Sequence, residues 1–153
     1  MRKDRWLEDF RPGETAEFGD HTMTEEAMIA FATQFDPQVF HIDPEGARSS
    51  VFGGLIASGW HTASVMMRML VDHWLPPAAS LGSPGLDEMR WLIPVRPGDR
   101  LRVRVTVVEQ RRSRSKPDRG IVRSFTEVLN QADAVVMTAR GLGMFRARPG
   151  VPD

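Results

Sequence analysis

An acidic side chain, Asp36, and an imidazole, His41, lie five positions apart in this chain of 153 residues. Taken alone, Asp36 is typical of a turn before a proline and His41 of a hydrogen-bonded structural histidine. Together, a carboxylate and an imidazole that share one water can remove a proton from it and deliver a proton to a substrate carbon. The glycine-rich segment 52–59 follows them, and amides at a helix start there can stabilise negative charge on an oxygen. The pattern predicts proton transfer beside an oxyanion site.

Two predicted helices position these residues, and the first precedes them. It begins at Thr24, with acids in its first turn, where the helix dipole favours them. Pro37 should end this helix before Asp36, because the residue before a proline is pushed out of the helical region. Asp36 and His41 are therefore expected on a loop.

The second predicted helix, 59–74, is the longer of the two. Ser58 is its expected N-cap, and two prolines follow its end. Apolar residues occupy most of its circumference, so this helix must be covered on most sides.

The rest of the chain has the alternation of a sheet. Strands are predicted at 15–21, 86–93, 100–110, 121–130 and 133–145. Within 100–110, apolar and polar residues alternate with the period of two that gives a sheet one wet face. An antiparallel sheet wrapped around the long apolar helix satisfies both patterns. We therefore predict an α+β fold with a single hot-dog domain over residues 1–153, a length that suits one domain.

The composition argues against several classes of site and location. Without cysteine there is no disulfide, thiolate nucleophile or cysteine-based metal centre, which fits a cytoplasmic location. The first nine residues lack the apolar run of a signal peptide, and the longest apolar runs fall short of the roughly 20 residues that span a bilayer. The other histidines, His21, His61 and His73, do not form a metal-ligand spacing with acids. We expect a soluble, cytoplasmic protein with no metal ion and no membrane partner.

The charges are unevenly distributed although they sum to zero. Residues 1–99 carry 8 basic and 15 acidic side chains, and residues 100–153 carry 12 and 5. Overall neutrality argues against tight nucleic-acid binding, while the basic C-terminal part can hold a smaller anion. A basic cluster there consists of Arg111, Arg112, Arg114, Lys116 and Arg119. This cluster is either a solvated hairpin tip, as most exposed charge runs are, or a contact for phosphate.

Three segments, 36–41, 52–59 and 91–99, resemble the corresponding parts of the MaoC-like dehydratases, relatives of R-specific enoyl-CoA hydratase. The likeness covers most of the chain. In that family an Asp and a His with this separation hold one water. A backbone N–H at the following helix start holds the carbonyl oxygen of a thioester.

The resemblance assigns roles to five residues. It implies that Asp36 and His41 are the catalytic pair. It places the oxyanion and substrate-binding site at Gly59, with Ser58 and Trp60 beside it. Which member of the pair takes the first proton stays open, because two interacting titratable groups behave as a coupled pair.

The resemblance also implies the reaction, which is reversible hydration of a 2-enoyl-CoA thioester to a 3-hydroxyacyl-CoA. Coenzyme A is then part of the substrate, and no separate cofactor is expected. Candidate partners for its phosphates are Arg111, Arg112, Arg114 and Lys116. Proteins of this fold usually pair through an exposed edge strand, so a homodimer or a multiple of one is expected.

The sequence departs from the hydratase pattern at two places. The chain has Gln38 and Val39 shortly before the histidine, where the family commonly has Asn-Pro. Met67 occupies a position where R-specific hydratases can place a serine near the catalytic acid, although Ser64 lies one turn earlier. The sequence therefore does not indicate which side chain would hydrogen-bond to Asp36.

Three other functions are open alternatives. A hot-dog thioesterase commonly has an acid on or just before the central helix, and here that helix carries only Asp72, near its far end. A non-catalytic protein that binds acyl thioesters would keep the pocket without the chemistry. A nucleic-acid-binding module would act through the basic cluster.

Overall fold

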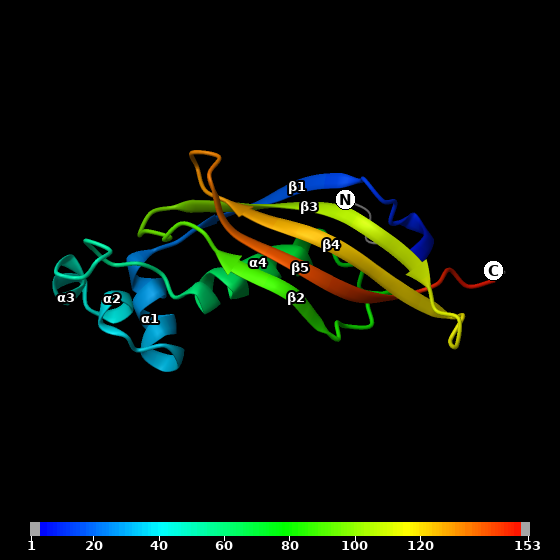
Figure 1. Cartoon of the computed structure of the whole chain (residues 1–153), viewed down its shortest axis with the longest axis horizontal. Helices are drawn as coiled ribbons and strands as arrows, with labels where there is room; N and C mark the ends of the chain where they lie inside the picture. Colours follow the sequence, from blue (N-terminus) through cyan, green and yellow to red (C-terminus); the bar gives the residue numbers. More distant parts are fainter. Residues whose placement is uncertain (1–3, 151–153) are drawn as a thin grey trace.

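The computed structural model describes residues 4–150, in which a five-stranded antiparallel sheet covers one long helix (Figure 1). The elements are the 3-10 helix η1 (Leu7–Asp9), β1 (Thr15–Thr22), α1 (Glu25–Phe35), α2 (Val39–Ile42), α3 (Pro44–Arg48), α4 (Gly59–His73), β2 (Gly85–Trp91), β3 (Arg100–Arg112), β4 (Arg119–Leu129) and β5 (Val135–Arg146). The strand order is β1-β3-β4-β5-β2. The predicted α+β hot-dog architecture is confirmed; residues 1–3 and 151–153 of the predicted domain lie outside the described part.

The helix α4 and the sheet share the main core. Strand β3 alternates buried and half-buried residues over most of its length, as its sequence predicts. Its Val103 and Val105 are buried in the same cluster as Val65 and Met69 of α4. None of the helices within residues 4–150 is long and apolar enough to cross a membrane.

A glycine in β1 lets the sheet approach α4 closely. Gly19 has a φ of +87° and lies where the pairing register of β1 with β3 shifts. A Cβ at this position would overlap the side chain of Met69. The positive φ and the close approach both favour glycine here.

The end of α1 agrees with the sequence, but the segment after it does not. The helix ends at Phe35, and Asp36 is its C-cap. The expectation that His41 lies on a loop is wrong, because Val39–Ile42 form the short helix α2. Pro37 disfavours helical backbone only for the residue before it, so the chain becomes helical again two residues later.

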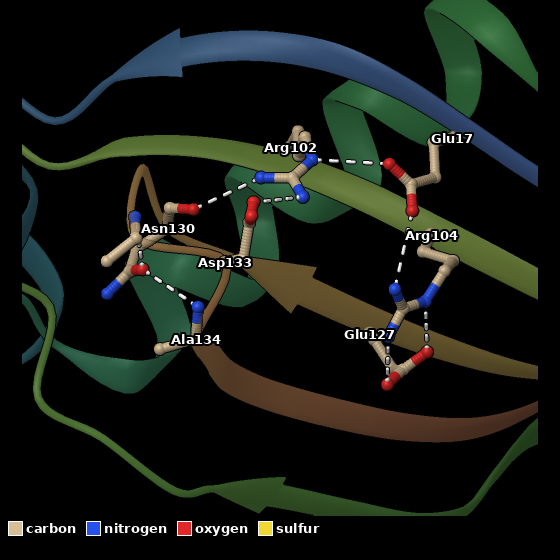
Figure 2. A network of polar contacts seen from close by, with 8 residues as sticks. Glu17, Arg102, Arg104, Glu127, Asn130, Asp133 and Ala134 are labelled. Atoms are coloured by element: carbon tan, nitrogen blue, oxygen red, sulfur yellow. Dashed lines mark hydrogen bonds and ion pairs between the residues drawn. The ribbon is translucent and has the colours of Figure 1, made fainter.

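Arginines on the wet face of β3 form ion pairs with acids of β1, of β4 and of the turn between β4 and β5 (Figure 2). Arg104 donates to both carboxylate oxygens of Glu127, at 2.7 and 2.8 Å. Arg102 donates to Asp133 at 2.6 Å, and Glu17 of β1 lies 3.3 Å from both arginines. The charges on this face are therefore largely balanced, and they link β1, β3 and β4 through side chains.

Candidate active site

The structure brings Asp36 and His41 together beyond one end of the sheet, where α1 to α3 lie (Figure 1). Asp36 follows the last turn of α1, and its N–H donates to the Ala32 carbonyl at 2.8 Å. His41 is on α2. Asp36 Oδ2 lies 3.3 Å from His41 Nε2, and the side chains are 19% and 7% exposed. The two groups are thus in contact and largely shielded from solvent.

The backbone fixes the tautomer of His41. Its Nδ1 lies 2.8 Å from the carbonyl oxygen of Ile56. Because a carbonyl only accepts, Nδ1 carries the hydrogen and donates it. In the neutral imidazole, Nε2 is then an acceptor that faces the Asp36 carboxylate. Two acceptors at this distance need a hydrogen between them, from a protonated imidazole or from a water that donates to both.

Two further side chains support Asp36. Gln38 Nε2 donates to Asp36 Oδ1 at 2.7 Å, and Ser58 Oγ donates to Asp36 Oδ2 at 2.7 Å. The hydrogen bond from Gln38 is the largest cause that lowers the pKa of Asp36; burial opposes it, and Ser58 and the nearby His41 add to the lowering. Asp36 therefore stays ionised at neutral pH.

Neither supporting residue has this role in the sequence prediction. Gln38 is conspicuous there only as a departure from the family pattern. Met67, at the position considered for a supporting serine, is 45% exposed, and Ser64 Oγ donates to the carbonyl of Trp60. The serine that supports Asp36 is Ser58, 22 positions away in the sequence.

Ser58 occupies the N-cap position of α4 but its side chain does not cap the helix. Its carbonyl accepts from the amides of His61 and Thr62, at 3.0 and 3.2 Å. Within residues 4–150, the amides of Gly59 and Trp60 have no protein acceptor. Two N–H groups at a helix start, where the dipole is positive, can thus bind an oxygen that develops negative charge.

Gly59 is packed against an indole ring. A Cβ at position 59 would overlap the ring of Trp91. Trp91 Nε1 also donates to the Gly59 carbonyl at 2.9 Å, and its ring meets Trp60 edge-on at 5.3 Å between centroids. The close approach of Trp91 is a reason for glycine that the sequence prediction does not contain.

A pocket of about 470 Å³ connects these groups. Asp36, His41 and Gly59 line it together with Trp60 and Thr62. Most of the remaining wall is apolar and comes from Phe40, Phe52, Trp91, Leu92 and Ile93. An apolar chain can therefore be enclosed beside the acid–imidazole pair and the free amides.

The basic cluster lies far from this pocket within the chain. Arg111, Arg112, Arg114 and Lys116 are at the β3–β4 hairpin, at the opposite end of the sheet from α1 (Figure 1). β3 has 13 residues, which span roughly 40 Å in an extended strand. Arg112 also pairs with Glu8 at 2.9 Å. The structure does not bring the basic cluster and the Asp36–His41 pair together within this chain.

His61, in the first turn of α4, has no place in the pocket. It is buried and stacks on Phe31 of α1, with ring centroids 4.8 Å apart. Within the described chain, its Nδ1 has no hydrogen-bond partner. Residues 4–150 contain no group of three or more His, Asp or Glu side chains placed to hold a metal ion.

We expect the stability of the fold to decrease below about pH 6.5 because of His61. Burial lowers its pKa, and the charge of His21 adds to this. Below the ordinary histidine pKa of about 6.5 the unfolded chain then binds more protons, so the free energy of unfolding falls by up to about 1.4 kcal/mol per pH unit until the folded pKa is reached. Urea unfolding between pH 5 and 8 should show a smaller decrease in His61→Leu. The same replacement at the exposed His73 should leave the decrease intact; an equal decrease in His61→Leu would contradict this role.

Replacing Gln38 by leucine should raise the pKa of Asp36. The substitution removes the hydrogen bond that lowers this pKa most, and Gln38 is exposed, so the fold should be kept. A ¹³C NMR titration of the Asp36 carboxyl carbon measures the effect without a substrate. Gln34→Leu, on the exposed side of α1, is the matched control. An unchanged titration in Gln38→Leu would show that the amide does not stabilise the carboxylate.

Comparison with known proteins gives consistent matches. The model of the MaoC like domain matches residues 9–128. The crystal structure of a MaoC-like dehydratase from Rhodospirillum rubrum is 44% identical, covers 95% of this chain and 99% of its own, and superposes with a TM-score of 0.89. YdeM, an uncharacterized protein of Bacillus subtilis, is 26% identical over 85% of this chain and 91% of its own length. The 3-hydroxyacyl-thioester dehydratase Z of Mycobacterium tuberculosis is 33% identical over 57% of this chain and 59% of its own.

Proposed function

This chain belongs to the MaoC-like dehydratase family, and we propose that it is a hydro-lyase that reversibly hydrates a 2-enoyl thioester to a 3-hydroxyacyl thioester. The observation that carries the proposal is the contact of Asp36 Oδ2 with His41 Nε2 in a pocket that is otherwise mostly apolar. The name of the Mycobacterium tuberculosis relative, a 3-hydroxyacyl-thioester dehydratase, supports the substrate class.

In the proposed reaction, one water binds beside the two catalytic side chains, on the pocket side, and contacts both of them. The water donates to Asp36 and His41, and its oxygen attacks C3 of the enoyl group as the pair accepts one of its protons. Negative charge then moves to the thioester carbonyl oxygen, where the N–H groups of Gly59 and Trp60 stabilise it. The pair returns the proton to C2, so the elements of water are added across the double bond. Asp36 stays ionised and stabilises the charge that His41 acquires.

The carrier of the acyl group is coenzyme A in this proposal, and no separate cofactor takes part. The apolar walls at Phe40, Phe52, Trp91 and Ile93 suit an acyl chain. Because the basic cluster lies at the far end of the same subunit, it can contact carrier phosphates only from a partner subunit. We place the reaction in the cytoplasm, which agrees with the absence of cysteine.

A homodimer provides such a partner. β2 is an edge strand of the sheet, so one side of its backbone is open for pairing with another strand. Large apolar side chains are exposed near it and on α4, at Met67, Val71, Leu86, Leu92 and Ile93. Pairing of β2 with β2 of a second copy would satisfy the backbone and cover part of this apolar surface.

Incubation with crotonyl-CoA and longer 2-enoyl-CoA thioesters tests the function. The conjugated absorbance and the free thiol are followed together. We expect the absorbance to fall without release of thiol. Thiol release would indicate a thioesterase instead, and binding without either change would indicate a non-catalytic acyl-thioester-binding protein.

The thioesterase alternative has less support from the site. Asp72 is the one acid in the sequence of α4, and it is bonded to Arg68 at 2.8 Å near the C-terminal end of the helix. It does not line the pocket. The hydratase is therefore the better-supported reading.

A further inference from the structure

The turn between β2 and β3 carries an arginine, Arg96, for which the proposed mechanism has no role. Its N–H donates to Asp99 Oδ2 at 2.8 Å, and the N–H of Asp99 donates to the Arg96 carbonyl at 3.1 Å. Asp99 is itself buried, and its other oxygen accepts from Gln131 Nε2 at 2.9 Å. The Arg96 side chain therefore extends from a well-fixed backbone.

The guanidinium group of Arg96 contacts the loop formed by residues 50–56. Its Nη2 donates to the carbonyl oxygen of Phe52 at 2.5 Å. Its Nη1 lies beside Gly54, where a Cβ would come within 3.4 Å of it. Among the ion pairs of residues 4–150, none involves Arg96. A planar group with several donors in fixed directions suits the holding of a loop backbone.

The same loop contacts His41 by two routes. The ring of Phe52 packs edge-on against Phe40, with centroids 5.1 Å apart, and Phe40 packs edge-on against His41 at 4.6 Å. At the end of the loop, the Ile56 carbonyl accepts the hydrogen bond from His41 Nδ1. The first route restrains the plane of the imidazole, and the second fixes its tautomer.

We propose that Arg96 is a positioning residue that acts on His41 through the 50–56 loop. By holding the Phe52 carbonyl it keeps the Phe52 and Phe40 rings in place against the imidazole, while the Ile56 carbonyl that accepts from Nδ1 is held by the backbone hydrogen bonds of Ile56 to Phe40 and of Ala57 to Val95. The geometry of the Asp36–His41 pair then depends on a group outside the pocket. The expected effect on kcat rests on the proposed hydration. The expected effect on the geometry of the His41 ring does not.

The structural consequence is tested on the protein without substrate. ¹⁵N NMR of the His41 ring should show Nδ1 protonated and its hydrogen slow to exchange in the wild type. In Arg96→Gln we expect exchange at least about tenfold faster, because the Phe52 and Phe40 rings no longer restrain the imidazole that donates to the Ile56 carbonyl. Phe52→Leu keeps Arg96 and should disturb the ring contact, which makes it a second variant if Arg96→Gln folds poorly. Arg48→Gln, an exposed arginine on the neighbouring α3, should leave the exchange unchanged.

The kinetic consequence is tested with one enoyl group on two carriers, coenzyme A and N-acetylcysteamine, which has no phosphate. In Arg96→Gln, kcat should fall about 10- to 100-fold on both carriers, since small misplacement of a catalytic group has effects of this size. A higher KM confined to the coenzyme A thioester would show a phosphate contact and overturn the proposal. Unchanged exchange together with unchanged kcat would overturn it as well. If the wild type itself does not hydrate either thioester, the proposed function fails, and the NMR comparison still decides whether Arg96 positions His41.

Discussion

Replacing Asp36 by asparagine or His41 by alanine should lower kcat for hydration by about 10²- to 10⁴-fold, the usual contribution of a positioned acid or base. Asparagine keeps the shape of Asp36 but has no negative charge to stabilise a charged imidazole or to accept a strong hydrogen bond from the water. Alanine removes the Nε2 acceptor of His41 altogether. Initial rates of the loss of conjugated absorbance measure the effect, and thermal unfolding shows whether the fold is kept.

Two controls separate this effect from general damage. Glu26→Gln changes an exposed acid of α1, and His73→Gln an exposed histidine of α4; both should retain wild-type rates. Near-normal turnover in Asp36→Asn and His41→Ala, with hydration intact in the wild type, would show that the pair is not the catalytic centre.

Replacing Gly59 by alanine should destabilise the protein although alanine favours helices. The gain in helix propensity is at most about 1 kcal/mol, whereas forcing a methyl group into a filled space typically costs about 1–3 kcal/mol. Because the new Cβ would overlap the Trp91 ring, we expect a net decrease in the free energy of unfolding of up to about 2 kcal/mol. Hydration should also slow, since the amides at the start of α4 would be displaced from the pocket.

A double-mutant cycle identifies Trp91 as the cause. With Trp91→Ala as the background, Gly59→Ala should be neutral or slightly stabilising, because the clash is gone and the propensity gain remains. Urea unfolding of the four proteins gives the coupling energy. Equal destabilisation by Gly59→Ala in both backgrounds would mean that the indole does not require the glycine.

The sequence predicts the fold well because each pattern is local. The period of two in β3 requires a core on one face of the sheet, and the apolar surface of α4 requires cover on most sides. A sheet wrapped around the helix satisfies both requirements. The spacing of Asp36 and His41 is likewise a local feature, because the two residues are five positions apart in the sequence. Pro37 correctly predicts the end of α1. No local pattern predicts that a second helix, α2, begins at Val39 and includes His41.

The supporting contacts are harder to predict because they depend on the folded chain. Ser58 precedes a helix and so resembles an ordinary N-cap, yet its hydroxyl bonds to Asp36, 22 residues earlier. Gln38 supports Asp36 only because its side-chain amide points toward the carboxylate. Trp91 reaches Gly59 across 32 positions. The charge pattern, similarly, does not show that the basic cluster lies a full strand length away from the pocket.

In the proposed mechanism Asp36 and His41 act as one unit on a shared water, and a double-mutant cycle in kcat/KM for 2-enoyl-CoA hydration tests this coupling. Residues that act as a unit are strongly non-additive. We therefore predict that the double variant, Asp36→Asn with His41→Ala, is about as slow as the slower single variant. Losses that multiply, so that the double variant is slower by the product of the two single effects, would contradict a shared water and require separate roles for the two side chains.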